Sequence, residues 1–368
     1  MSAPGTGKRI AFVLPNLGGG GAERVALTVI RDLLAQGHSV DLLLLQRAGE
    51  LLPLVPGDEH IIDLGVSRIA AALSPLTRYL RRARPDALHA MMWPLTVVAS
   101  AAHALARSSA RLTLSDHTTV SQHNRGLSRL SRLGLRASVR LFYPRAAGRI
   151  VCSHEAAADL ARLSCLPSQL FEAVYNPVDP PSPRPACDTV DQYWQVTPGR
   201  RILAMGQFKP EKNFQLLVRA FAKVCTVQPT AKLAIVGDGP ERASVSLAVQ
   251  ELGLADKVVL PGFVLDPWPW FYSADLFVLS SHTEGFGLVL VEALAAGLPV
   301  VSTDCDHGPR EILENGRFGQ LVKPGDSDAL ADAILAALQQ PPDPERSRGR
   351  ARQVSGGALK RWQEIVLG

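Results

Sequence analysis

Two glutamates lie eight positions apart in the segment HTEGFGLVLVEALAAGLPVVSTD (282–304), which is otherwise nearly apolar. Glu284 precedes a Gly-Phe-Gly turn, and Glu292 is the only charged residue between Glu284 and Asp304. Burial of an unpartnered carboxylate costs roughly several kcal/mol, so each acid needs hydrogen-bond donors. Sugar hydroxyls would supply them, and so would an arginine elsewhere in the chain. Because two such acids flank one glycine turn, we favour sugar hydroxyls over arginines as their hydrogen-bond donors.

The residues between the two acids predict which backbone amides would contact a ligand. The apolar run predicts a helix that begins near Leu288, with Glu292 one turn inside it and Glu284 ahead of it. Free amides at a helix start bind anions and polar groups. The amides expected to face the ligand are those of Gly285, Phe286, Gly287 and Leu288.

A run of four glycines in NLGGGGAERV (16–25) stands between a predicted strand and a predicted helix. Glycine lets the backbone approach a ligand closely, and a helix start carries about half a positive charge. The pattern predicts a phosphate cradle at Gly20 and Gly21, since a plain turn rarely needs four glycines. A dinucleotide fingerprint fits poorly, because Glu23 occupies the place of its last glycine.

A second phosphate-binding candidate is MGQFKPEKNF (205–214), which follows the first predicted strand of the second half. Lys209 and Lys212 stand in the loop between this strand and the next helix. A lysine in that position can neutralise a diphosphate. Two solvated loop lysines are an equally good interpretation of the same pattern.

The composition indicates a globular chain of two domains. The 368 residues are too many for one ordinary core, and 46% are hydrophobic against 20% charged. Residues 1–184 carry 21 basic and 13 acidic side chains, so this half is expected to attract phosphates. Five cysteines without a CxxC pair favour a reduced chain over a disulfide framework. Nucleic acid is a poor candidate partner, because the arginines come without interleaved aromatics.

Apolar strands alternate with helical segments through both halves, for example RIAFVLPNL before AERVALTVIRDLLAQG and RRILAMGQF before FQLLVRAFAKV. This order predicts an α/β chain with parallel sheets covered on both faces. The segment 175–188 contains five prolines and no periodicity, and is predicted to link the domains. We expect two Rossmann-like, doubly wound domains (1–180 and 181–355) facing a central cleft, and a C-terminal helix (356–368) that packs on the first.

One stretch has the length of a membrane span. ALHAMMWPLTVVASAAHALA (87–106) contains no Asp, Glu, Lys or Arg. We interpret it instead as a buried strand followed by a helix that begins at Pro94, where proline is favoured. The N-terminal IAFVLP is too short for the apolar core of a signal peptide, so a cytoplasmic chain is expected.

The combined motifs resemble a known family. EGFGLVLVEALAAGLPVV resembles the E-x7-E segment of the large retaining glycosyltransferase family of GT-B fold, family 4. GGGGAERV, YNPVD, GQFKPEKNF, VGDGP, PGF and STDCDHGPREIL fall at that family's places and in its order, over nearly the whole chain. GGAERV with STDCDHGPREI looks most like bacterial members that extend surface or lipid-linked polysaccharides.

The resemblance implies a role for each matching residue. Glu284 would face the donor sugar and the reacting face, and Glu292 would bind the ribose hydroxyls. Lys212 would hold the diphosphate, beside Gln207 and Lys209. The amides of residues 285–288 would bind sugar and phosphate oxygens.

Two further matches lie in the first half. Gly20 or Gly21 would approach the β-phosphate. His117, in LSDHTT, matches the family's donor-facing histidine, although a lone histidine is more often structural.

One position departs from the family pattern. Glutamine stands at position 207, where the family usually has an arginine between the glycine and the lysine that match Gly206 and Lys212. The nearby Lys209 is a flexible ammonium and does not replace a bidentate guanidinium. The leaving-group contact is therefore in question.

The resemblance implies transfer of a sugar from a nucleotide-diphosphate donor, UDP-linked by expectation, to a saccharide or lipid-linked acceptor with retention at the anomeric carbon. The family segment around DCD (304–306) uses no metal, so we expect no metal and no cofactor. The alternatives are a nucleotide-sugar epimerase of the same fold and a catalytically inactive glycan-binding or assembly component.

A row of arginines lies in NRGLSRLSRLGLRASVRLFYPRAAGR (124–149). Their spacings of 4, 3, 4 and 4 would place them within roughly 80° on a helix, opposite Leu127, Leu130 and Leu141. Asp and Glu are absent from 117 to 154, which favours contact with anionic lipid or a lipid-diphosphate acceptor at the inner face of the membrane. The alternative is a surface helix with solvated arginines whose leucines meet the core. The arginines are Arg125, Arg129, Arg132, Arg136 and Arg140.

Overall fold

The computed structural model describes residues 7–57, 60–124, 126–178, 180, 187–194, 200–340 and 343–368. The chain divides into two compact units. The first comprises residues 1–177 together with 357–368, and the second comprises residues 178–356. The last helix of the chain therefore belongs to the first unit, whereas residues 178–180 belong to the second.

The first unit is built on a parallel seven-stranded sheet with the order β3-β2-β1-β4-β5-β6-β7. One of its inner strands, β1, reads RIAFVL, and all residues after the first are buried, as expected for a strand covered on both faces. The strands are β1 (Arg9–Leu14), β2 (Ser39–Leu44), β3 (Ile61–Asp63), β4 (Ala87–Met91), β5 (Arg111–Asp116), β6 (Gly148–Val151) and β7 (Glu172–Ala173).

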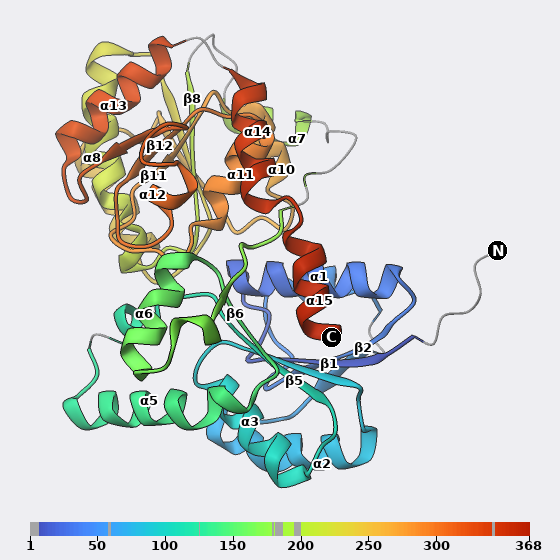
Figure 1. Cartoon of the computed structure of the whole chain (residues 1–368). Coiled ribbons are helices and arrows are strands. Elements are labelled where there is room, and N and C mark those ends of the chain that lie inside the picture. Colours follow the sequence, from blue (N-terminus) through green and yellow to red (C-terminus); the bar gives the residue numbers. More distant parts are fainter. Residues whose placement is uncertain are drawn as a thin grey trace. The chain divides into compact units, whose positions relative to one another are not determined.

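Helices cover both faces of this sheet (Figure 1). α1 and α15 lie on one face, and α2 and α3 lie on the other. The helices are α1 (Gly21–Ala35), α2 (Leu73–Ala83), α3 (Leu95–Ala106), α4 (Val120–His123), α5 (Arg129–Phe142), α6 (His154–Ser164) and α15 (Ala358–Leu367). Single 3₁₀ turns stand at Leu52–Leu54, Ile69–Ala72, Tyr143–Arg145 and Ser168–Leu170.

The apolar stretch 87–106 forms β4 and the 12-residue helix α3. Pro94 is the cap residue of α3, one position before the first helical residue. Within the described ranges of the chain, no helix is long and apolar enough to cross a membrane.

The second unit contains a parallel six-stranded sheet with the order β10-β9-β8-β11-β12-β13. Its core is formed by apolar side chains of the strands and of the helices α8, α9 and α13. The strands are β8 (Arg201–Met205), β9 (Lys232–Val236), β10 (Val258–Gly262), β11 (Leu276–Leu279), β12 (Val300–Thr303) and β13 (Gln320–Val322). The helices are α7 (Asp188–Trp194), α8 (Phe214–Val227), α9 (Arg242–Glu251), α10 (Trp268–Ser273), α11 (Leu288–Ala296), α12 (Pro309–Ile312), α13 (Ser327–Gln339) and α14 (Pro344–Ser355), and Pro210–Lys212 form a 3₁₀ turn.

Both sheets confirm the predicted doubly wound α/β architecture. In each sheet the strand order reverses beside a central strand, between β1 and β4 in the first unit and between β8 and β11 in the second. Ligands of such sheets bind outside the carboxyl ends of the strands at this reversal point. The loops that follow β1, β4, β8 and β11 are therefore the first places to look for a site.

The C-terminal helix α15 is held to the first unit by both its core face and its ends. Trp362 is fully buried, and Lys8 Nζ donates to the carbonyl oxygen of Leu367 at 2.7 Å. The guanidinium of Arg361 pairs with Glu172 beside β7. A side chain at Gly148 would collide with Ile365, so β6 and α15 approach closely at that point.

Candidate active site

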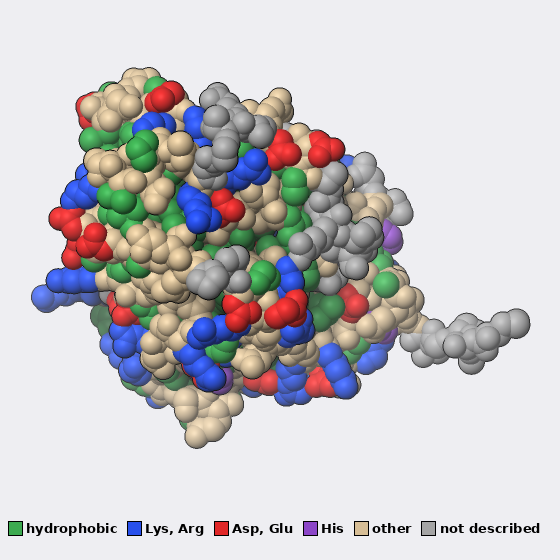
Figure 2. Space-filling view, turned by 90° about the horizontal axis from the view of Figure 1, so that it is seen from above, with side chains coloured by type: hydrophobic (Ala, Val, Ile, Leu, Met, Phe, Trp, Pro, Cys, Tyr) green, Lys and Arg blue, Asp and Glu red, His purple; other side chains and the backbone are tan. Residues whose placement is uncertain are grey.

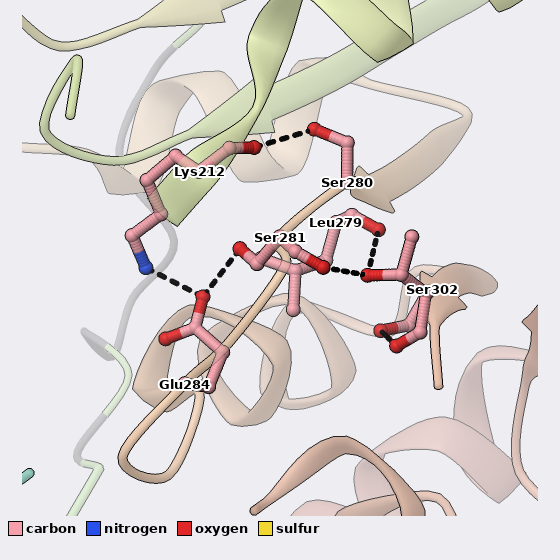
Figure 3. A network of polar contacts seen from close by, with 7 residues as sticks. Lys212, Leu279, Ser280, Ser281, Glu284 and Ser302 are labelled. Atoms are coloured by element: carbon pink, nitrogen blue, oxygen red, sulfur yellow. Dashed lines mark hydrogen bonds and ion pairs between the residues drawn. The ribbon is translucent and has the colours of Figure 1, made fainter. Parts of the chain in front are cut away.

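The second unit brings Lys212 and Glu284 into direct contact at its strand reversal point. Lys212 ends the 3₁₀ turn after β8, and Glu284 lies in the loop after β11. Lys212 Nζ donates to Glu284 Oε1 at 2.6 Å, and the side chains are 21% and 8% exposed. The acid predicted to hold sugar hydroxyls and the lysine predicted to hold a diphosphate thus form one ion pair (Figure 3).

Ser281 completes this group from the end of β11. Its hydroxyl donates to the same oxygen, Glu284 Oε1, at 2.6 Å. Among the residues that the structure describes, none donates to Glu284 Oε2. One carboxylate oxygen therefore fixes the side chain, and the other is available to a ligand hydroxyl.

A second layer of hydrogen bonds holds the strand ends in place (Figure 3). Ser280 Oγ donates to the carbonyl oxygen of Lys212 at 2.9 Å, which ties the β8 turn to β11. Thr303, at the end of β12, donates to the carbonyl oxygen of Ser281 at 2.6 Å. The three strand ends are thus locked to one another, which limits movement of the Lys212–Glu284 pair.

The helix predicted near Leu288 is confirmed as α11. Its cap residue Gly287 has φ +88° and offers no side chain to the first amides of the helix. The preceding turn is packed tightly, because a Cβ at Gly308 would lie 1.8 Å from the carbonyl oxygen of Phe286. Glu292 lies in the second turn of α11 and is half-buried.

The other residues predicted near the diphosphate have different environments. Lys209 is exposed at the start of the 3₁₀ turn, and its amide donates to the carbonyl oxygen of Gln207 at 2.8 Å. Gln207 is half-buried. The DCD segment is partly engaged within the chain, because the guanidinium of Arg310 makes two hydrogen bonds to Asp304.

In the first unit, the glycine run forms the loop between β1 and α1. Gly20 is the cap residue of α1, and Gly21 is its first helical residue. No side chain caps this helix start, whereas the carboxylate of Glu23 lies against Gly20. The loop therefore leads into a helix start without a side-chain cap, as expected for a phosphate cradle, but with an acid nearby.

His117 follows β5 and is buried, with 8% of the residue exposed. Its Nε2 is hydrogen-bonded to Ser115 Oγ at 3.1 Å, and its Nδ1 has no hydrogen-bond partner in the part of the chain that the structure describes. Burial lowers the pKa of His117 to about 4, so the ring is neutral near pH 7.

Thr119 Oγ1 is a further buried atom without a hydrogen-bond partner among the described residues. The Asn176 side chain lies close enough to His117 for a hydrogen bond that opposes the lowering of the His117 pKa. Buried polar atoms such as Thr119 Oγ1 usually have partners. All three residues belong to loops that follow β5 or β7. We expect a ligand to supply the missing partners.

Trp362 of α15 stacks on the His117 ring with centroids 5.6 Å apart and an interplanar angle of 22°. It also meets His89 edge-on at 5.3 Å. Burial lowers the pKa of His89 to about 3, and the nearby His117 adds to that effect. The sequence analysis did not single out Trp362, Ser281, Thr119 or Asn176, although Asn176 stands in the quoted motif YNPVD.

The arginine row predicted for residues 124–149 lies mostly on α5. Arg129, Arg132, Arg136 and Arg140 are exposed on α5, whereas Arg125 lies outside the described residues. The alternative in which the leucines meet the core is wrong for Leu130 and Leu141, which are 81% and 54% exposed.

The solved structure of the Anabaena protein HepE in complex with UDP-glucose is similar to this chain. The two share 21% identity with a TM-score of 0.78, over 97% of this chain and 98% of the other. The likeness establishes the two-domain GT-B fold. Two family models then match in succession, Glycosyltransferase Family 4 over residues 19–181 and Glycosyl transferases group 1 over residues 195–354. The chain belongs to the GT-B glycosyltransferases of family 4.

Two relatives are similar in part of their length. N-acetyl-alpha-D-glucosaminyl L-malate synthase of Bacillus anthracis is 31% identical over 202 residues, which are 54% of this chain and 52% of the relative. N-acetylgalactosamine-N,N'-diacetylbacillosaminyl-diphospho-undecaprenol 4-alpha-N-acetylgalactosaminyltransferase of Campylobacter jejuni is 34% identical over 138 residues, which are 38% of this chain and 37% of the relative. The chain thus spans about half, or less, of these relatives.

Proposed function

We propose that the chain is a metal-independent, retaining glycosyltransferase that moves a hexosyl group from a UDP-sugar to a saccharide or lipid-linked acceptor. The contact that carries this proposal is the Lys212–Glu284 ion pair at the strand reversal point, beside the uncapped start of α11. Glu284 and Lys212 match the acid and the lysine to which the family resemblance gives contact with the donor, and both are present in this chain.

Each part of the pair has a distinct task in this proposal. Glu284 Oε2 accepts a hydroxyl of the donor sugar, while Ser281 keeps the carboxylate oriented. Lys212 Nζ uses one hydrogen for Glu284 and has two more for diphosphate oxygens. The amides ahead of α11 stabilise negative charge that develops on the leaving diphosphate.

Retention follows from a front-face route. The glycosidic C–O bond to the diphosphate breaks, the acceptor oxygen bonds to the anomeric carbon from the same face, and the leaving phosphate oxygen takes the acceptor proton. No side chain then has to act as a nucleophile. The neutral His117 accepts or donates a hydrogen bond to the sugar without adding charge.

A uridine nucleotide is supported by the UDP-glucose complex of the similar Anabaena protein. A lipid-linked acceptor is supported by the diphospho-undecaprenol in the name of the Campylobacter relative. An inactive binding component is the alternative that Gln207 favours, because the family's arginine is missing there.

The test is a thermal-shift screen of the full chain against UDP-, GDP-, ADP- and dTDP-sugars, followed by a transfer assay with the sugar that binds. A ligand at 100 times its Kd stabilises the folded state by about 2.7 kcal/mol, which is readily seen. A shift with UDP-sugars and slow release of UDP would support the proposal. A shift without any turnover, restored by Gln207→Arg, would identify an inactive member instead.

A further inference from the structure

α5 exposes a row of apolar side chains that the core does not use. Leu130, Leu133 and Leu141 are 81%, 58% and 54% exposed, and Ala137 between them is exposed as well. At about 100° per residue these four fall within roughly 80° of one another. Leu135 and Val139, which are buried, lie on the opposite side of the helix. We call the exposed row 130, 133, 137 and 141 the apolar ridge.

The exposed arginines of α5 each precede a ridge residue by one position. Arg129, Arg132, Arg136 and Arg140 therefore form a second row, about 100° around the helix from the apolar ridge. Within the described residues, no ion pair joins these four arginines to an acid. A helix with an apolar row flanked by cations has the pattern of a helix that lies in a membrane interface.

Two of these arginines are held in fixed orientations by backbone oxygens. Arg132 Nε donates to the carbonyl oxygen of Leu127 at 3.2 Å, and Arg136 Nε donates to that of Leu163 at 3.0 Å. Arg136 Nη2 also donates to Cys165 Sγ at 3.3 Å, so this guanidinium keeps only part of its N–H groups for a ligand. Arg132 and Arg136 also line an open pocket of about 670 Å³ between α5 and α6, together with Arg129 and Arg162.

The acid in the lining of that pocket is already engaged. Asp159 Oδ1 accepts from Ser121 Oγ at 2.7 Å, and its Oδ2 accepts from the Ser121 amide at 3.3 Å. Four arginines against one aspartate give the pocket lining a net positive charge that suits phosphate groups.

The position of α5 in the first unit leaves this surface accessible. The helix lies along an edge of the unit, in contact with α3 and α6 on its inner side (Figure 1). Elsewhere the charges are mixed: the face seen in Figure 2 shows basic and acidic side chains next to one another. The segment from 117 to 154 contains arginines and no acid.

We propose that α5 binds the surface of an anionic phospholipid bilayer. The apolar ridge enters the boundary between headgroups and acyl chains, and the arginine row and the α5–α6 pocket meet the lipid phosphates. Two signals of this kind, apolar burial and charge attraction, give stable but reversible binding.

The test is co-sedimentation of the full chain with vesicles of phosphatidylglycerol and phosphatidylcholine, compared with phosphatidylcholine alone. Wild type should pellet with the anionic vesicles at low salt and be released at high salt. Leu130→Gln, Leu133→Gln and Leu141→Gln together should lower the partition coefficient at least tenfold, because exposed leucines contribute only where they can be buried. Arg129→Gln, Arg132→Gln and Arg136→Gln together should lower it by roughly a hundredfold at low salt, at about fivefold per arginine.

Matched controls come from exposed positions in the second unit. Val227→Gln, Leu247→Gln and Leu252→Gln also remove three exposed apolar side chains, and Arg200→Gln, Arg219→Gln and Arg352→Gln remove the same number of charges. These two variants should pellet like wild type. Circular dichroism checks that every variant is folded.

Three outcomes would overturn the proposal. The first is equal pelleting by wild type and the leucine variant, which would mean that the ridge does not enter the bilayer. The second is release by inorganic diphosphate at constant ionic strength, which would identify the pocket as a site for a soluble anion. The third is a dimer of wild type that the leucine variant converts to monomer without loss of vesicle binding, which would identify the ridge as a contact between copies of the chain.

Discussion

Removal of one partner from the Lys212–Glu284 ion pair is expected to change both stability and transfer. Lys212 Nζ and Glu284 Oε1 lie 2.6 Å apart, and the side chains of Lys212 and Glu284 are 21% and 8% exposed. Loss of one partner from a fully buried pair costs about 3–5 kcal/mol, whereas an exposed pair contributes about 0–1 kcal/mol. This pair lies between those limits, so Lys212→Met and Glu284→Gln should each cost about 1–3 kcal/mol.

The double variant separates the pair from its surroundings. Because both single changes break the same contact, the double variant should lose about 1–2 kcal/mol less than the sum of the two singles. Scanning calorimetry measures this, since about 1 kcal/mol shifts the Tm of a 150–250-residue unit by roughly 2–4 °C. Arg317→Gln is the control, because the Arg317–Glu314 pair is 67% and 43% exposed and should contribute little.

Transfer should fall far more than stability. Glu284→Gln keeps the shape and the contact with Ser281 but removes the charge, and we expect a loss of about 10²–10³ in kcat, the range found for one preorganised stabilising group. Lys212→Met should lower donor affinity as well as kcat. If the stability losses of the two single variants are not additive but transfer stays near normal, the pair is only structural. If the double variant loses as much stability as the two single variants together, the two side chains do not contact each other in solution.

Three further predictions concern metal, pH and backbone. Transfer should survive excess EDTA, and loss of activity with EDTA that manganese restores would contradict this. Gln207→Arg should tighten donor binding, and weaker binding would show that glutamine has a role of its own. His89 and His117 have pKa values lowered by burial to about 3 and about 4 from 6.5, so unfolding takes up protons below pH 6.5 and stability should fall from pH 6.5 toward 4. Burial raises the pKa of Asp116 to about 6, which has the opposite sign and offsets part of that fall. Calorimetry of His117→Gln should show a shallower dependence of Tm on pH, and an unchanged slope would refute the assignment. Gly308→Ala should cost more than about 3 kcal/mol, because its φ is +106° and the new Cβ would meet the Phe286 carbonyl at 1.8 Å; Gly325→Ala, with φ +86° and open space around it, should cost only about 1 kcal/mol.

Much of the fold could be predicted because its signals are local. A run such as RIAFVL followed by glycines and an apolar-periodic helix specifies a strand and a crossover without any knowledge of neighbours. The start of α11 at Leu288 was predictable for the same reason, since the glycine turn precedes an unbroken apolar run. The return of the last helix to the first unit was expected, but its contacts were not: Arg361 and Glu172 lie 189 positions apart, and no local pattern indicates that they meet.

The candidate site was only partly predictable from the sequence. Glu284 and Lys212 stood out as single residues, but their contact spans 72 positions and depends on the placement of β8 next to β11. Ser281 carried no signal, because a serine at the end of a strand is common. Its role appears only once Oε1 of Glu284 is seen to accept from both neighbours.

α5 shows why the burial of a helix face could not be predicted from periodicity alone. Leu130, Leu133 and Leu141 form one apolar row, and Leu135 and Val139 form another on the opposite side. Both rows have helical spacing, so the sequence does not state which one faces the core. Packing against α3 and α6 selects the second row and leaves the first exposed.

The Lys212–Glu284 ion pair explains how two partly buried charges can be held at the proposed donor site without a large loss of stability. Without a donor, Lys212 and Glu284 compensate each other, and Ser281 supplies a second donor to the same carboxylate oxygen. In the proposed reaction, the Lys212 ammonium would turn one of its remaining hydrogens toward the diphosphate oxygens without leaving Glu284. Glu284 would keep its orientation, because Ser281 continues to donate to it and the Ser281 carbonyl is itself held by Thr303. The site is therefore organised before substrate arrives, which reduces the reorganisation that the reaction itself would require.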